Sequence, residues 1–258
     1  MPFGLGSLRR LFLGAFVLGL AAPAMAQIPL QQVGVISLLG ENLQIVSAAD
    51  VTDTRIDRNL HESLPIKDIG FDTAALRGVR DSVAFLRPDA KIHMYKAPQP
   101  LTALQQREIA YGAARGELPG WIVGAIQSAK LSHVLLISQH FGEASFAMED
   151  GHSIGRGTVI GVGYYIDKIT EVKDPRTQVT SRGFLGQYAY LRLTLMDTRS
   201  AEVVAGYDIR ASRAVGAKSG SAATEPWDFL TPQEKIEQLR QMVQQNVARA
   251  MTPLLANR

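Results

Sequence analysis

The chain has 258 residues, of which 46% are hydrophobic and 20% charged, with 23 glycines, 12 prolines and no cysteine. This composition is typical of a globular protein and excludes disordered, collagen-like and disulfide-stapled classes. Without cysteine there are no thiol nucleophiles and no thiolate metal sites, so packing alone must stabilise the fold.

The first 26 residues have the pattern of a secretory signal peptide. A positive region is followed by an apolar run over residues 11–20 and by the small-x-small motif Ala24-Met25-Ala26, which signal peptidase requires. The apolar run is shorter than the roughly 20 residues that span a bilayer, and Pro23 follows it. We therefore expect cleavage near Ala26-Gln27, with cleavage after Ala24 as the alternative, and no stable membrane anchor afterwards.

Cleavage would leave a mature chain that is close to neutral. The full chain carries 27 basic and 24 acidic residues, and removing Arg9 and Arg10 leaves 25 basic residues, a formal charge of +1. Such a chain lacks the positive excess that attracts a phosphate backbone, so we expect no nucleic-acid partner. No later stretch is apolar and long enough to span a bilayer. A periplasmic or secreted location is therefore expected.

The first half of the mature chain shows strand and helix patterns in alternation. Apolar, β-branched runs predict strands, and apolar residues at helical spacing predict helices. In chain order these are strands over 33–39 and 43–46 joined as a hairpin, a polar excursion over 47–70, a helix over 72–86 capped by Asp72 or Thr73, a strand over 91–95, helices over 102–115 and 119–130, and a buried strand over 133–138.

The second half is dominated by strand patterns and ends in a helix. In order, it predicts an irregular segment over 141–157, a glycine-rich strand over 158–166, a loop over 167–183, an antiparallel hairpin of strands 185–196 and 202–210, and a flexible segment over 211–224. The capping box Thr231-Pro232-Gln233-Glu234 then predicts a helix start, with fraying near Pro253. The whole order predicts a single mixed α/β domain over residues 27–258: a sheet with packed helices, an antiparallel hairpin near the C-terminal end and a closing helix.

One motif suggests an enzyme. Gly151-His152-Ser153-Ile154-Gly155 matches G-x-S-x-G, the nucleophile elbow of serine hydrolases, in which the serine lies between a strand and a helix. Here residues 156–166 predict a strand in place of the helix, and no histidine follows His152 to complete the α/β-hydrolase order. A flexible loop is the favoured interpretation, and a serine hydrolase that uses Ser153 is the alternative function.

Cofactor and metal patterns are missing from the sequence. The glycines between 155 and 163 run into a strand and do not open a helix, as a dinucleotide loop would. His133 and His140 would lie about 23 Å apart on an extended strand, too far to share an ion, and we expect local partners for His133. Neither an H-E-x-x-H zinc motif nor a calcium loop occurs. We therefore assign no catalytic residue, no cofactor and no metal.

Three segments carry a resemblance to known envelope proteins: Val33–Ser37, Ser132–Ile137 and Leu193–Val204. The last is similar to a hairpin with a leucine-rich strand, an aspartate, a turn and Glu-Val-Val, with Ser200-Ala201 where Thr-Gly is usual. In this order the chain resembles the α/β domains of the curli-secretion lipoprotein, the penicillin-binding-protein activator lipoprotein and the N-terminal domain of the Tol periplasmic protein. The first strand and residues 158–166 also resemble an exported proteobacterial family with no assigned function.

The resemblance implies binding or assembly and no catalytic residues. Membrane tethering does not carry over, because the lipid-bearing cysteine of the lipoproteins is absent. Together with export, this predicts a non-catalytic periplasmic protein that acts by protein binding or envelope assembly, with envelope proteins as partners and a subunit of an oligomeric assembly as a further reading. We expect contact surfaces on the loops 141–157, 167–183 and 211–225, because loops tolerate variation while the sheet holds them.

Overall fold

The computed structural model describes residues 31–49, 57, 59–113, 117–148, 151–173, 180–217 and 223–256; the predicted signal peptide and its cleavage point lie outside them. The strands are β1 (Gln32–Ser37), β2 (Asn42–Ser47), β3 (Leu60–Pro65), β4 (Lys91–Lys96), β5 (His133–Gln139), β6 (Phe141–Glu143), β7 (Phe146–Ala147), β8 (Ser153–Ile154), β9 (Thr158–Lys173), β10 (Thr180–Asp197) and β11 (Val203–Val215). The helices are α1 (Phe71–Leu86), α2 (Ala103–Ala113), α3 (Gly120–Ala129) and α4 (Pro232–Ala256), with a 3-10 turn, η1 (Pro226–Phe229).

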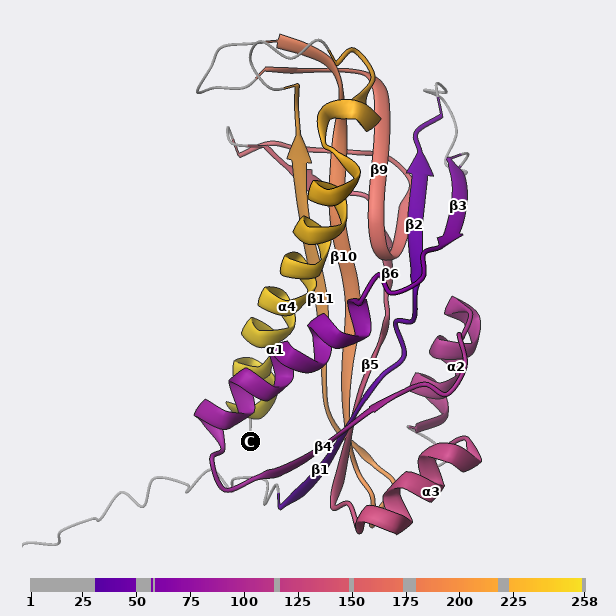
Figure 1. The fold of residues 1–258 in the computed structure, drawn as a ribbon, viewed down its shortest axis with the longest axis vertical. Helices are drawn as coiled ribbons and strands as arrows, with labels where there is room; N and C mark the ends of the chain where they lie inside the picture. Colours follow the sequence, from indigo (N-terminus) through magenta and orange to yellow (C-terminus); the bar gives the residue numbers. More distant parts are fainter. Residues whose placement is uncertain are drawn as a thin grey trace, which may run out of the picture.

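The predicted fold class is confirmed: one nine-stranded mixed sheet carries packed helices, and α4 closes the chain. The long β10–β11 hairpin joins the two halves of this sheet. One edge of β10 pairs with β11, while the opposite edge pairs with β9 along Thr180–Tyr190 and with β5 along Leu191–Asp197. On one side of β10, the strands β9, β2 and β3 form what we call the upper half-sheet. The strands β5, β1 and β4 form the lower half-sheet (Figure 1).

The predicted hairpin over 33–46 is wrong. β1 pairs with β4 and β5, whereas β2 pairs with β3 and β9. Each is parallel to a strand that runs antiparallel to β10, so β1 and β2 point in the same direction, one in each half-sheet. Gly40 has a φ of 69°, in the left-handed region that favours glycine. The chain at Gly40 therefore passes sideways from one half-sheet to the other and does not reverse its direction.

Strand pairing also extends further than the sequence predicts. The expected excursion over 47–70 contains β3, an edge strand with every side chain exposed. The expected loops 167–183 and 211–224 contain the end of β9, the start of β10 and the end of β11, while residues 174–179 and 218–222 lie outside the described residues. β3 is fully exposed and the ends of β9 and β11 are only partly buried, so backbone pairing fixes them and side-chain hydrophobicity carries little signal.

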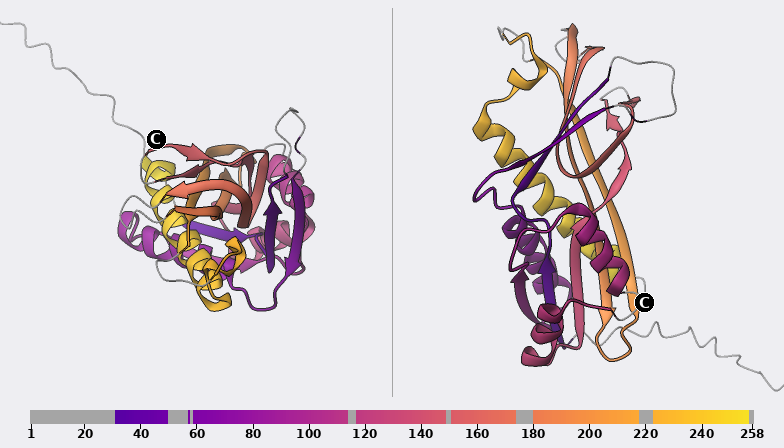
Figure 2. Two further views of the ribbon diagram at one scale, coloured as in Figure 1. Left: turned by 90° about the horizontal axis from the view of Figure 1, so that it is seen from above. Right: turned by 90° about the vertical axis from the view of Figure 1, so that its right-hand side faces the viewer.

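The main core lies between one face of the sheet and the helices α1 and α4. The predicted alternation in β10 is confirmed, since Leu191, Leu193 and Leu195 enter this core while Tyr188 and Tyr190 face the other way. On that opposite face, α2 and α3 cover the lower half-sheet, and the segment around β7 covers the upper one. α4 runs alongside the β10–β11 hairpin in each view (Figures 1 and 2).

The two ends of α4 differ in how well the sequence predicts them. The capping box is confirmed: the Thr231 amide donates to Glu234 Oε2 at 2.8 Å and the Glu234 amide donates to Thr231 Oγ1 at 3.2 Å. The expected fraying near Pro253 is wrong, because the helix continues to Ala256. Leu254 and Leu255 are buried in the main core, and this packing outweighs the amide that proline lacks.

The start of α1 is also corrected. Neither Asp72 nor Thr73 caps it, because the helix begins at Phe71 after Gly70, which has a φ of 76° and offers no side chain. The buried carboxylate of Asp72 instead accepts the Gly40 amide at 3.3 Å and so ties α1 to the step between β1 and β2. Within the described residues, no helix combines the length and the hydrophobicity needed to cross a bilayer.

Candidate binding groove

Ser153 lies in a two-residue strand. In β8 it stands opposite Ala147 of β7, and the Gly151 amide closes the turn onto the Met148 carbonyl at 3.0 Å. The next element is the strand β9, so the serine does not stand before a helix N-terminus as in a nucleophile elbow. The hydrolase alternative stays a prediction, with no geometry here that favours it.

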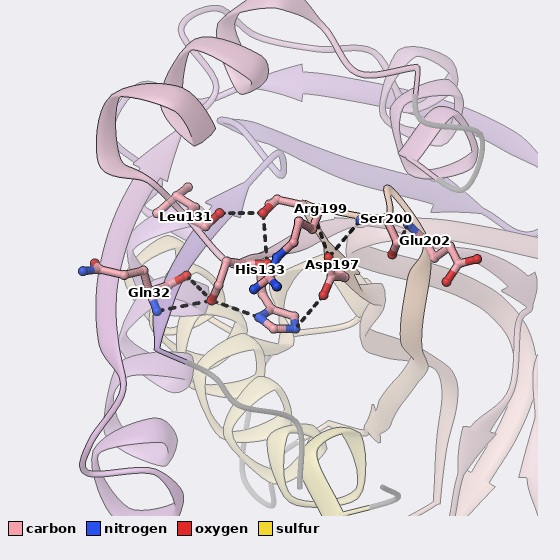
Figure 3. A network of polar contacts seen from close by, with 9 residues as sticks. Gln32, Leu131, His133, Asp197, Arg199, Ser200 and Glu202 are labelled. Atoms are coloured by element: carbon pink, nitrogen blue, oxygen red, sulfur yellow. Dashed lines mark hydrogen bonds and ion pairs between the residues drawn. The ribbon is translucent and has the colours of Figure 1, made fainter. Parts of the chain in front are cut away.

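A histidine and an aspartate, His133 and Asp197, meet at the start of β5 (Figure 3), and Ser132 lies beside the histidine. Ser132 Oγ lies 3.0 Å from His133 Nδ1, and His133 Nε2 lies 3.7 Å from Asp197 Oδ2. The local partners expected for His133 are therefore confirmed. Two of the segments that carry the family resemblance, 132–137 and 193–204, come together in this network.

The contacts of this network show a structural role. Ser132 Oγ donates to the Gln32 carbonyl at 2.9 Å and lies 3.3 Å from the Gln32 amide nitrogen. Asp197 Oδ1 accepts the amides of Arg199 at 2.7 Å and Ser200 at 3.0 Å. These bonds use the serine oxygen inside the sheet, and His133 is only 3% exposed. The network thus ties β1, β5 and the β10–β11 turn together, and the Ser132 hydroxyl donates its proton to a backbone carbonyl.

Two histidines near the ends of β5 should make the protein less stable in mild acid. Burial lowers the pKa of His133 below its ordinary value of 6.5, against the attraction of Asp197. Burial also lowers the pKa of His140 below 6.5, against the attraction of Asp208. In the unfolded chain both rings take up protons near pH 6.5, whereas the folded protein binds them only at lower pH. The contribution of these two histidines to the free energy of unfolding is therefore constant above this pH and falls as the pH drops below it.

Urea unfolding at a series of pH values between 7.5 and 5 measures this loss. A histidine that is protonated only in the unfolded chain contributes at most about 1.4 kcal/mol per pH unit. The double variant His133→Gln, His140→Gln should have a flatter dependence below pH 6.5 than the wild type. A wild-type slope in this variant would show that other groups cause the acid sensitivity.

A groove of about 600 Å³ lies along the outer edge of β11, between that strand and α4, with Ala147 of β7 at its other side. We call it the β11 groove. Its lining includes three arginines, Arg210, Arg213 and Arg249, and amide side chains of α4, and none of the described residues that line it is an aspartate or glutamate. In the part of the chain that the structure describes, none of these arginines forms an ion pair with a carboxylate. The groove is therefore cationic.

Arg213 is held in place by two hydrogen bonds, one partly buried and one exposed. Its Nη2 donates to Gln187 Oε1 at 2.9 Å and to Gln238 Oε1 at 2.7 Å. The side-chain Nε2 of Gln187 also donates to Gln238 Oε1. Gln187 is fully buried between the sheet and α4. One guanidinium nitrogen is thus anchored to β10 and α4, while the side chain as a whole stays exposed at the groove.

The backbone of β11 is open along this groove. Among the described residues, β10 is its only strand partner. The Tyr190 carbonyl accepts the His140 amide on the far edge of β10, so the neighbouring Ala189 and Leu191 bond to β11. Antiparallel strands alternate in this way, so the amide and carbonyl groups of Arg210 and Ser212 point outward into the groove. An unpaired row of this kind is a template for another strand.

The expected contact loops contribute in part. Residues 211–213, from the predicted loop 211–225, and Ala147, from the predicted loop 141–157, line the groove. No described residue of 167–183 does so. The sequence interpretation missed Arg249 and the glutamines of α4. Their signal was the polar face of the closing helix, opposite its apolar stripe. Within the described residues, no cluster of three or more acidic or histidine side chains is placed to hold a metal ion.

Comparison with known proteins gives limited similarity. No family model and no curated protein matches this chain. Among solved structures, a Helicobacter pylori protein described as a homologue of the neuraminyllactose-binding hemagglutinin is 9% identical, with 90% of this chain and 86% of that one covered and a TM-score of 0.39. A Xanthomonas campestris protein of the DUF330 family is 10% identical, with 91% and 90% covered and a TM-score of 0.34.

Proposed function

We propose that the chain is an exported, non-catalytic protein of the cell envelope that binds another protein through the β11 groove. The observation that carries this proposal is the combination, at one edge, of outward backbone groups and three arginines that form no ion pair with a carboxylate of the described residues. Soluble proteins usually protect a free sheet edge, because it pairs readily with other chains. A free edge beside arginines that have no carboxylate partner in the described ranges is therefore a surface suited to a partner.

The chemistry of the lining favours recognition over catalysis. Arginine and amide side chains donate hydrogen bonds and attract negative charge, but they do not accept a proton near neutral pH. Among the described residues that line the groove, Ser212 carries the one hydroxyl, which donates to the Ser145 carbonyl. Export to the periplasm is supported by the signal-peptide pattern of residues 1–26, and the resemblance to envelope domains supports a protein partner.

Site-specific photo-crosslinking in the organism of origin tests the proposal. A photoreactive residue at Gln241, in the groove, should give an adduct with another protein. The same residue at Leu104, which is 62% exposed on α2 and lies outside the groove, serves as the control and should not give that adduct. The change Arg249→Glu should remove the Gln241 adduct. Equal adducts from both positions, or an adduct that Arg249→Glu leaves unchanged, would contradict the proposal.

A further inference from the structure

We infer that the β11 groove takes an extended acidic segment of its partner, which adds to the sheet as a new strand beside β11. This inference rests on the proposed function and names the chemistry of the ligand. Two features of the groove carry it: the direction of the free backbone groups and the placement of the three arginines on both sides of the strand.

The groove has room for one strand of about five residues. A strand added to a sheet lies about 4.8 Å from its neighbour and rises about 3.3 Å per residue. On α4, the lining runs from Gln238 to Arg249, which corresponds to about 16 Å of helix. An extended segment of about five residues has the same length. Its amides and carbonyls would meet the outward groups of Arg210 and Ser212.

The arginines set the spacing of the charges on this segment. Arg213 contacts Gln238, so its side chain lies on the face of the sheet that α4 covers. Arg210 lies on the opposite face, because it stands three residues earlier in the same strand and pairs with Tyr190 of the other core. Side chains of an added strand alternate between the same two faces. Carboxylates three residues apart would therefore reach both arginines, and Arg249 adds a positive charge on the α4 side.

A second copy of this chain does not suit the same edge. Two-fold antiparallel pairing of β11 with the β11 of another copy would place four arginines, Arg210 and Arg213 of each copy, on one short stretch of paired edge, and the registers centred there put like charges opposite or diagonal to each other on one face. Like charges opposite each other on paired strands are destabilising. The amide side chains of Gln241 and Gln245 also favour a polar segment, since they can both donate to and accept from it.

Fluorescence anisotropy with synthetic peptides tests the inference on the mature chain, residues 27–258. The probe is a labelled nine-residue peptide of alternating threonine and valine, with glutamate at its fourth and seventh positions. We expect saturable binding to the wild-type protein and none for the same peptide with lysine at those positions. Methylation of alternate backbone nitrogens on the bonding edge of the probe should weaken binding about tenfold or more, because it removes the donors of the added strand.

Two substitutions at Ser212 separate strand addition from simple charge attraction. Ser212→Pro removes the outward amide, and proline is tolerated at the edge of a sheet. Ser212→Ala loses the same hydroxyl contact with the Ser145 carbonyl but keeps the amide. We expect binding about tenfold weaker for Ser212→Pro and within about twofold of the wild type for Ser212→Ala. Equal binding by the two variants would overturn the inference, because charge alone would then hold the peptide.

Charge-reversal variants form the second part of the peptide-binding experiment. Arg210→Glu and Arg249→Glu should each weaken binding about tenfold, whereas Arg107→Glu, at an exposed position of α2, should leave it unchanged. Thermal unfolding shows that each variant is folded before binding is measured. Displacement of the probe by a single-stranded oligonucleotide as readily as by unlabelled peptide would also overturn the inference, since a nucleic acid cannot pair with the sheet edge.

The two proposals can fail separately. If no acidic peptide binds while the Gln241 adduct forms and depends on Arg249, the strand inference is wrong and the proposed function stands. If the peptide binds as expected but no groove-specific adduct forms in the organism, the inference stands and the proposed function is wrong.

Discussion

Replacing Phe146 with alanine is expected to lower the free energy of unfolding by about 3 to 5 kcal/mol. Phe146 is fully buried at the centre of the aromatic cluster on the face of the upper half-sheet opposite α4. Its ring centroid lies 4.9 Å from that of Tyr165 and 5.6 Å from that of Phe184. Gly186 makes room for the ring, since a Cβ there would lie 2.5 Å from a Phe146 ring atom. Truncation of Phe146 to alanine would leave a cavity, because Gly186 has no side chain that could fill the space.

Urea unfolding of Phe146→Ala, compared with Phe85→Ala, checks this expectation. Phe85 is 85% exposed on α1, so the same truncation there should change the free energy of unfolding by no more than about 0.5 kcal/mol. Near-ultraviolet circular dichroism should also change for Phe146→Ala, because the surrounding tyrosine rings lose their fixed packing. Similar small losses in both variants would show that the segment around β7 does not cover the sheet in solution.

The role of Phe146 illustrates what the sequence could not predict. Residues 141–157 read as an irregular loop because β7 and β8 have two residues each, too few to show any period. The space for the ring is created by Gly186, forty residues later in the chain. The choice between a turn and a sideways step at Gly40 likewise depends on partner strands far away in sequence. Patterns within a short stretch of sequence do not show which distant strands will pair.

Local sequence patterns did predict the helices and strands that are determined by residues within the element itself. The apolar stripes of α1 and α4, the buried run of β5 and the alternation in β10 each follow from residues within one element. The capping box at Thr231 is a bond between neighbours and is confirmed in detail. The fold class then follows from the order of these elements, even though the pairing of β1 and β2 does not.

The groove was only partly predictable for the same reason. A polar helix face has the same pattern whether it meets water or borders a groove, so Arg249 gave no separate signal. Arg213 lies in a stretch of small and polar residues that reads as flexible, although its backbone extends β11. The contact that holds its guanidinium comes from Gln187 and Gln238, each about 25 residues away. Only the folded arrangement shows that these arginines share one edge.

A single type of substitution, glycine to alanine, should have opposite effects at two helix positions. A Cβ at Gly78 in α1 would lie 2.5 Å from the Gln244 carbonyl oxygen and 3.2 Å from the Ala248 amide nitrogen in α4. Both are backbone atoms, so the two helices must move apart. We expect Gly78→Ala to lower the free energy of unfolding by about 1 to 3 kcal/mol, although alanine favours helix formation.

Gly124→Ala is the matched control in α3. A Cβ there meets no heavy atom within 4 Å, so the change should raise the free energy of unfolding by about 0.5 to 1 kcal/mol through helix propensity alone. Urea unfolding of both variants under one set of conditions gives the two signs directly. Equal stabilisation by both substitutions would mean that α1 and α4 do not touch at Gly78. The position of α4 beside β11, which forms one wall of the groove, would then be wrong as well, because α1 and α4 pack on the sheet as one layer.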